Sequence, residues 1–263
     1  MSNKDLNFFK TKELEISILN EIEKNNKDII KHDFNDEIVW IKRPRQTNSN
    51  IFHKMAYNMT KIKGLMPVEK KSKEQTLIHE VSKIQRLYEK GIKVPQVLGC
   101  NNNIFVLEDT GVTIKSYLRN KELNRNIFES KLKETLQLLI NMHLKNEYHA
   151  GPQVKNYTIK NGIVYAIDFE DSFDSRFSLE DIQFRDFFLF LFSLTELKKD
   201  IDYKEIVEIY MKETKKLGID KELKSIALKL NFLTKIVENR FLHNLFFDDV
   251  INTYKLIKTL QKL

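Results

Sequence analysis

Cysteine is almost absent from the sequence. The 263 residues include a single cysteine, Cys100, which excludes an intrachain disulfide framework and fits a reducing compartment. The first fifteen residues lack the apolar segment of a secretory signal. The apolar run at residues 187–194 is much shorter than the roughly 20 residues that a membrane-spanning helix needs, so we expect a buried helix there. These shortages favour a cytoplasmic location.

Internal repeats and low-complexity linkers are also missing. Hydrophobic residues make up 41% of the chain and charged residues 31%, which is typical of a soluble globular protein and argues against a disordered one. A chain of this length can bury a full core, either as one large domain or as two lobes that share a cleft.

Acidic residues are scarce in one stretch of the chain. Between residues 42 and 73, nine lysines and arginines accompany one acid, Glu69. This segment therefore carries the whole positive excess of a chain whose net charge is +7. A localised basic patch indicates an anionic partner more strongly than diffuse basicity does. The alternative is a solvated helix that has no partner.

Strand-like segments come early in the sequence and helical segments follow. Residues 37–42 and 104–108 have strand character, whereas residues 4–32 predict a helix, or a helix plus a short strand. A hairpin is expected where residues 157–160 and 163–168 flank an Asn-Gly turn. The remaining periodic segments predict helices at residues 51–65, 72–90, 113–120, 127–146, 179–198, 203–217 and 220–260. This order predicts an α+β fold with a small strand-containing N-terminal lobe, residues 1–109, and a mostly helical C-terminal lobe, residues 110–263.

Lys42 and Glu80 are the first candidates for a functional site. Lys42 ends the 37–42 strand, where a lysine is most often a solvated cap. Glu80 shares the apolar face of the predicted 72–90 helix, and a carboxylate in such a face is costly unless it is paired. Lys42 is its natural partner. The alternative is that Glu80 lies at the edge of the face and reaches solvent.

A second group of polar residues follows the helix at 127–146. His149 and Asn156 bracket a loop, and Asp168 follows the apolar residues 163–167. A carboxylate at the exit of a buried strand, beside an amide oxygen, offers the oxygen ligands that Mg²⁺ prefers. An Asp after a strand is otherwise most often a turn residue.

Five motifs between about residues 37 and 171 read, in order, IVWIK, IHEVSKIQRLYEKGIKVPQVL, FVLEDTG, HAGPQVKN and YAIDFED. In this order they resemble the motifs of bacterial atypical kinase-like proteins of the lipopolysaccharide-kinase, Kdo-kinase and RIO/Bud32 type. The resemblance implies a protein-kinase-like bilobal fold that uses ATP and Mg²⁺ as cofactors.

The same resemblance implies roles for individual residues. Lys42 would contact the nucleotide phosphates and Glu80 would position Lys42. Leu107 and Glu108 would lie at the hinge near the adenine. The remaining implied roles are bracing of the catalytic-type loop 149–156 by His149, and metal binding by Asn156 and Asp168.

Two parts of the kinase pattern are missing. No glycine-rich loop precedes Lys42, because residues 1–42 contain no glycine. Gly151 stands where the motif places its catalytic Asp, and a positioned general base typically contributes about 10²–10⁴-fold to the rate. Three interpretations remain open. Glu170 or Asp171 substitutes for the base, the acceptor is already ionised and needs none, or the site binds nucleotide without transferring a phosphoryl group.

The basic segment forms an insert, residues 43–73, between the Lys42 strand and the Glu80 helix. Phe52, Met55, Met59 and Ile62 share one face of the helix predicted there. A basic amphipathic helix can bind an anionic membrane surface, with about 1 kcal/mol per basic residue near it. Such a helix suggests a lipid or glycolipid acceptor. Alternatively, its apolar face packs on the first lobe.

The function expected from these observations is an ATP- and Mg²⁺-dependent phosphotransferase. Its acceptor would be a glycolipid, a lipid-linked molecule or a sugar at the cytoplasmic membrane face, so that the enzyme is cytoplasmic and possibly peripheral to the membrane. One alternative is a nucleotide-binding pseudokinase or scaffold. Another is a Bud32-like partner in tRNA modification, which ranks last because the basic segment lacks the interleaved aromatic residues of stacking platforms.

Overall fold

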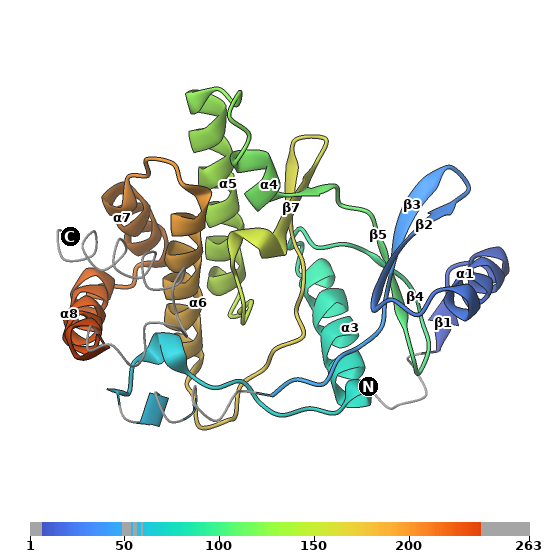
Figure 1. Ribbon diagram of the computed structural model, residues 1–263, viewed down its shortest axis with the longest axis horizontal. Coiled ribbons are helices and arrows are strands. Elements are labelled where there is room, and N and C mark those ends of the chain that lie inside the picture. The colour runs from blue at the N-terminus through green and yellow to red at the C-terminus, as the bar shows by residue number, and fades with distance from the viewer. Residues whose placement is uncertain (1–6, 49–53, 55–56, 59, 238–263) are drawn as a thin grey trace.

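The computed structural model describes residues 7–48, 54, 57, 58 and 60–237. It confirms the predicted α+β fold class, because an antiparallel sheet is built from the first part of the chain and helices dominate the rest. Figure 1 shows the sheet and helix α1 (Lys12–Lys24) on one side, helices α5 to α8 on the other, and helix α3 (Lys73–Glu89) between them.

The N-terminal lobe is a five-stranded antiparallel sheet. Its spatial order is β1 (Phe8–Phe9), β4 (Val97–Cys100), β5 (Phe105–Glu108), β3 (Glu37–Lys42) and β2 (Ile29–Phe34). Helix α1 packs Leu14 and Ile18 against the buried strand residues Ile41 and Val106. The predicted 37–42 strand is therefore an interior strand, with a neighbour on each side.

Helix α3 forms as its sequence predicts. Ser72 caps its N-terminus, and a reciprocal pair of hydrogen bonds between Ser72 and Gln75 completes a capping box. The apolar residues of α3 join the main hydrophobic core, and Glu80, which lies among them, is only 1% exposed. The sequence interpretation that Glu80 lies at a solvated edge is therefore wrong.

The C-terminal lobe begins with a short strand and is otherwise mostly helical. Its three-stranded sheet runs β6 (Val112–Thr113), β7 (Tyr157–Lys160), β8 (Ile163–Ala166). Its helices are α4 (Ile114–Leu118), α5 (Arg125–Leu144), the 3₁₀ helix η3 (Val154–Asn156), α6 (Leu179–Leu194), the 3₁₀ helix η4 (Thr195–Leu197), α7 (Tyr203–Thr214) and α8 (Ile219–Val237). Within the described ranges, no helix is long and apolar enough to span a bilayer.

Element boundaries differ from the sequence predictions at a few places. The strand expected at 163–168 ends at Ala166, and β2 extends from Ile29 to Phe34, where the prediction allowed for only a short strand within residues 4–32. Strand β6 was not predicted, since two residues carry no periodic signal. The helix expected at 220–260 is observed as α8, and residues 238–260 lie outside the described part of the chain.

Part of the predicted insert helix, including Phe52, Met55 and Met59, lies outside the described residues. The 3₁₀ helix η2 (Lys63–Leu65) follows and packs on α6 of the C-terminal lobe. An added Cβ at Gly64 would lie 2.4 Å from the side-chain ring of Phe188 of α6, which shows how closely the η2 backbone packs on that ring. Figure 1 shows this segment beside α6 and α8, far from the sheet. The alternative that the apolar face of the insert packs on the first lobe rests mainly on Phe52, Met55 and Met59, which lie outside the described residues, so it stays a prediction.

Gly111, between β5 and β6, is held in a conformation that only glycine adopts easily. Its φ is +86°, and an added Cβ would lie 2.1 Å from the Ile159 carbonyl oxygen. We expect Gly111→Ala to lower the free energy of unfolding by about 2–5 kcal/mol, which combines left-handed strain with overpacking. Urea denaturation measures the change.

Gly162 provides the matched control for this prediction. It also has a positive φ, +78°, but an added Cβ would meet nothing within 4 Å. Gly162→Ala should therefore cost only about 1–2 kcal/mol, the strain alone. Equal losses of unfolding free energy in the two variants would show that the contact with Ile159 does not contribute to the cost of Gly111→Ala.

Candidate nucleotide and metal site

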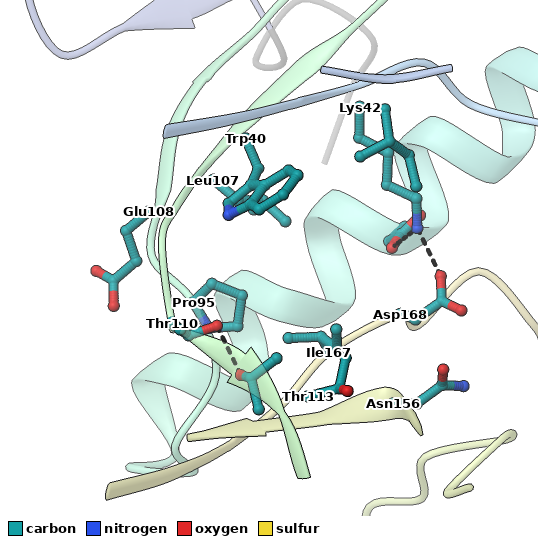
Figure 2. Close-up of a pocket in the computed structure, with 14 residues that line it drawn as sticks. Trp40, Lys42, Pro95, Leu107, Glu108, Thr110, Thr113, Asn156, Ile167 and Asp168 are labelled. Atoms are coloured by element: carbon teal, nitrogen blue, oxygen red, sulfur yellow. Dashed lines mark hydrogen bonds and ion pairs between the residues drawn. The ribbon is translucent and has the colours of Figure 1, made fainter. Parts of the chain in front are cut away.

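A cavity of about 320 Å³ lies between the two lobes. Strands β3 and β5 and helix α3 supply its N-terminal-lobe wall, and residues of the C-terminal lobe close it from the opposite side (Figure 2). It is lined by Ile29, Trp40, Lys42, Glu80, Pro95, Leu107, Glu108, Thr110, Gly111, Thr113, Asn156, Thr158, Ile167 and Asp168. Six of the residues singled out from the sequence therefore share this cavity: Lys42, Glu80, Leu107, Glu108, Asn156 and Asp168.

Lys42 joins two carboxylates at one end of the cavity. Its ammonium nitrogen lies 2.7 Å from Glu80 Oε1 and 2.6 Å from Asp168 Oδ1. Glu80 Oε1 also accepts a hydrogen bond from the Phe169 backbone N–H, at 3.3 Å. The three charged groups come from β3, from α3 and from the segment after β8, so this contact joins the two lobes.

Burial and mutual attraction set the ionisation of these groups. Burial disfavours the charged form of Lys42, but Glu80 and Asp168 outweigh this effect and raise the pKa of the ammonium. Burial likewise opposes ionisation of Asp168, yet the charge and hydrogen bond of Lys42 lower the pKa of that carboxyl group. For Glu80, burial dominates and raises the pKa, and its Oε2 has no partner among the described residues.

Asn156 and Asp168 present oxygen atoms on the same side of the cavity. The Asn156 side-chain amide donates to the Gly151 carbonyl at 2.8 Å, which leaves Asn156 Oδ1 free to face Asp168 (Figure 2). Asp168 has a φ of +69°, a left-handed conformation that aspartate tolerates better than most residues. Among the described residues no group of three or more His, Cys, Asp or Glu side chains could hold a metal. One carboxylate and one amide oxygen fit Mg²⁺, which often takes few protein ligands and completes its shell with water and phosphate.

The other end of the cavity is aromatic and apolar. Trp40 lines it, and its indole N–H donates to Asp109 Oδ1 at 2.8 Å. Asp109 in turn lies 3.2 Å from the Lys160 ammonium. Asp109 therefore links the Trp40 indole to Lys160 of the C-terminal lobe. The Glu108 carboxylate points away from the cavity in Figure 2, whereas Leu107 faces the indole. Trp40 was not singled out from the sequence, although it lies two residues before Lys42 in the quoted IVWIK motif.

His149 does not line the cavity. It is fully buried, its ring stacks on Phe169 with centroids 4.6 Å apart, and its Nδ1 accepts from the Gly151 N–H at 3.3 Å. Burial lowers the pKa of His149 to about 4, so the ring is neutral at physiological pH. Its position is that of a residue that supports the loop. Beside it, Gly151 has room for a side chain, because an added Cβ would lie 3.6 Å from Asn156 Nδ2.

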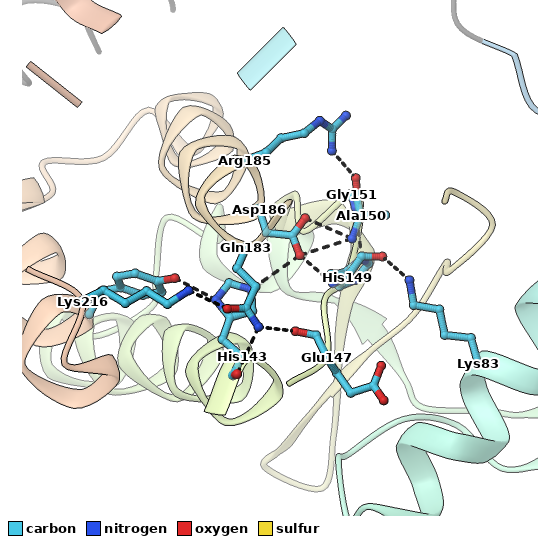
Figure 3. Close-up of polar contacts among 11 residues, drawn as sticks. Lys83, His143, Glu147, His149, Ala150, Gly151, Gln183, Arg185, Asp186 and Lys216 are labelled. Atoms are coloured by element: carbon cyan, nitrogen blue, oxygen red, sulfur yellow. Dashed lines mark hydrogen bonds and ion pairs between the residues drawn. The ribbon is translucent and has the colours of Figure 1, made fainter. Parts of the chain in front are cut away.

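Asp186 of α6 anchors the loop (Figure 3). Its carboxylate accepts from the His149 N–H at 2.6 Å and from the Ala150 N–H at 3.0 Å. Burial opposes its ionisation, but His143 and the neighbouring charges lower the pKa of the carboxyl group. Arg185 donates to the Ala150 carbonyl at 2.5 Å. Neither residue was predicted; the available signal was an Arg-Asp pair inside the Phe-rich sequence of this helix.

Glu170 and Asp171 lie just beyond Asp168 but do not line the cavity. Burial and the Asp168 charge raise the pKa of Glu170 to about 6. Burial also raises the pKa of Asp171, although Arg185 and Lys71 partly offset the effect. The backbone of this segment is fixed by Lys71, which donates to the Glu170 carbonyl at 2.6 Å.

Comparison with known proteins gives matches to a curated sequence and to solved structures. No protein-family model matches the chain. A Haemophilus influenzae protein described as uncharacterized is 29% identical over 116 residues, which make up 44% of this chain and 48% of that protein. The chain thus spans about half the length of this curated relative. Among solved structures, WaaP in complex with acyl carrier protein has a TM-score of 0.48 and 10% identity, covering 81% of this chain and 84% of the WaaP chain.

Proposed function

We propose that the chain binds ATP with Mg²⁺ in the cavity between its lobes and acts as a phosphotransferase. The observation that carries this proposal is the contact of Lys42 with both Glu80 and Asp168 at the cavity end where Asn156 also lies. Phosphoryl transfer requires a cation for the phosphates, a carboxylate that positions this cation, and oxygen ligands for the metal. These groups come together here from positions 42, 80, 156 and 168.

Each residue would have a defined task in this reaction. Lys42, held by Glu80, would contact the phosphate oxygens, while Asp168 and the Asn156 amide oxygen would hold Mg²⁺. The bound ion would neutralise charge that develops on the phosphates. The apolar end of the cavity, with Trp40 and Leu107, would take the base. The hydrogen bonds of the loop backbone would keep the Asn156 side chain in position beside Asp168.

The acceptor we propose is a glycolipid, a lipid-linked molecule or a sugar at the cytoplasmic face of the membrane. The support for this part is the basic segment 42–73 and the interlobe position of the cavity. Lys63, one of the segment's cations, is already paired with Asp181 at 2.7 Å and Glu222 at 2.6 Å. The cations left for an anionic surface are therefore fewer than the sequence suggests.

A second candidate function is nucleotide binding without transfer. Gly151 favours it, because no carboxylate stands at the position where the kinase motif places its base. ATP turnover measured against extracted membrane lipids and soluble sugars separates the two functions.

Binding of ATP can be followed directly, because Trp40 is the only tryptophan and lines the cavity. We expect Mg²⁺-ATP to change the tryptophan emission of the wild-type protein and to raise its melting temperature. In Asp168→Ala the Mg²⁺-dependent part of the affinity should fall by at least about tenfold, since hydrogen bonds to charged groups contribute about 1.5–3 kcal/mol.

Asp174→Ala is the control, because Asp174 is an exposed carboxylate of the same segment that lies outside the cavity. It should bind like the wild type. If wild-type emission and melting temperature do not respond to ATP with Mg²⁺, the proposed function is wrong.

A further inference from the structure

Helix α3 buries a lysine that the proposed reaction does not use. Lys83 lies three residues after Glu80 and is fully buried. Its ammonium nitrogen lies 3.9 Å from the centre of the Tyr148 ring and 5.7 Å from that of Phe169. A buried lysine is costly unless its charge is compensated, so its retention in the core requires a reason.

The hydrogen bond of Lys83 supplies one. Its ammonium group donates to the His149 carbonyl at 3.1 Å, which is a bond from α3 to the first residue of the loop 149–156 (Figure 3). No carboxylate lies within ion-pair distance of Lys83 among the residues that the structure describes. The backbone carbonyl and the two aromatic faces therefore stabilise the cation.

The loop that receives this bond is strained. Ala150 has a φ of +85°, a left-handed conformation that costs an alanine about 1–2 kcal/mol. Such a conformation persists only where its surroundings hold it. Asp186 holds the N–H groups of His149 and Ala150, and Arg185 holds the Ala150 carbonyl, all from α6. Lys83 holds the His149 carbonyl from α3, on the other side of the loop.

We propose that Lys83 is a positioning residue that couples the placement of helix α3 to the conformation of the loop 149–156. Glu80 and Lys83 lie on the same side of α3, so a shift of the helix that separates Glu80 from Lys42 also withdraws Lys83 from His149. The lysine–carboxylate contact at the cavity and the loop that carries Gly151 and Asn156 then form together. This coupling is a property of the protein itself and does not depend on nucleotide binding.

The charge of Lys83 sets the strength of the coupling, because a charged donor forms a hydrogen bond roughly twice as strong as a neutral one. Burial lowers the pKa of Lys83 to about 7, which Asp186 and Glu147 oppose and Arg86 and Lys71 reinforce. The other titratable groups facing it are His79, Tyr148, His149 and Asp171. We therefore expect the amides of the loop 149–156 to be better protected from exchange below pH 7 than above it.

Hydrogen–deuterium exchange tests the proposal on the full chain without any ligand. In Lys83→Met, amides of residues 147–156 should exchange about tenfold faster than in the wild type at pH 6.5, since one charge-assisted hydrogen bond is lost. Lys71→Met is the matched control, because Lys71 is a buried lysine that donates to the carbonyl of Glu170. It should accelerate exchange near residue 170 and leave the loop unchanged.

Combining Lys83→Met with Glu80→Gln tests the coupling itself. Glu80→Gln should accelerate exchange of the loop when Lys83 is present and add nothing in the Lys83→Met background. Additive effects, or unchanged loop exchange in Lys83→Met, would overturn the proposal. If Lys83→Met does not fold, the proposal is tested instead by comparing the hydrogen exchange of the wild-type loop at pH 6 and at pH 8. After correction for intrinsic rates, equal loop protection at both pH values would also overturn it.

Discussion

Replacing Asp186 by alanine is expected to lower the free energy of unfolding by about 3–5 kcal/mol, the range for removing one partner of a buried charged interaction. The carboxylate is fully buried and accepts from two backbone N–H groups that have no route to solvent. Its removal leaves both donors unsatisfied in the core, and it also removes the carboxylate that lies 3.5 Å from His143 Nε2. The strained Ala150 then loses its main restraint.

Two further variants make this prediction specific. Asp186→Asn keeps the shape and one acceptor oxygen, so its loss should be smaller than that of the alanine variant. Asp181→Ala changes a carboxylate on the same helix that pairs with Lys63 near the surface, and should cost no more than about 1 kcal/mol. Urea denaturation with an unchanged m-value measures all three. Similar losses for Asp181→Ala and Asp186→Ala would refute the anchoring role.

The sequence predicts the interior strand β3 and helix α3 well because both signals are local. Strand β3 has β-branched and aromatic residues, and α3 combines an apolar face with a capping serine. The Lys42–Glu80 contact was also predictable, because a carboxylate inside an apolar face requires a cation and β3 ends in one. These are arguments from patterns within single elements, which tertiary packing then leaves intact.

Other parts of the site depend on tertiary contacts, so the partners of their residues could not be predicted. Asp186 lies 37 residues from His149, and only the packing of α6 under the loop brings the two together. The sequence alone assigns Lys83 to the polar face of an amphipathic helix. Only the tertiary contact with the loop 149–156 shows that it is buried. Trp40 has no local signal for its position, which Asp109 fixes from across 69 residues. A buried polar residue is recognised from sequence only when its own element is strongly apolar.

The insert between β3 and α3 shows the same limit. Its composition predicts a basic amphipathic helix, but composition does not specify the surface on which a segment packs. Close approach of Gly64 to Phe188 and the ion pairs of Lys63 place the segment around η2 on the C-terminal lobe. After this segment, Glu69 and Lys71 bind residues 170–172 through backbone and side-chain hydrogen bonds. The insert therefore restrains the segment that carries Asp168.

Restoring the missing carboxylate should produce a gain of function. In Gly151→Asp we expect ATP turnover to rise by about 10²-fold, the lower end of the contribution of a positioned general base. The backbone of Gly151 is not in the left-handed region, and an added Cβ would make an ordinary contact of 3.6 Å with Asn156 Nδ2. The new carboxylate would stand beside the residues proposed to hold the metal, where an acceptor hydroxyl or water must approach. Steady-state release of ADP measures the effect.

The comparison with Gly151→Asn decides what the gain means, because asparagine has the same shape but accepts no proton. Turnover should stay at the wild-type level in Gly151→Asn and fall to background in the double variant Gly151→Asp with Asp168→Ala. If Gly151→Asp binds Mg²⁺-ATP normally but turns it over no faster, the missing base is not what limits the wild-type protein. An acceptor that is already ionised, or a site whose task is binding alone, would then explain Gly151. Because Asn156, Asp168, Lys42 and Glu80 are unchanged in all these variants except the double one, the outcome isolates position 151, where the kinase pattern has its catalytic Asp.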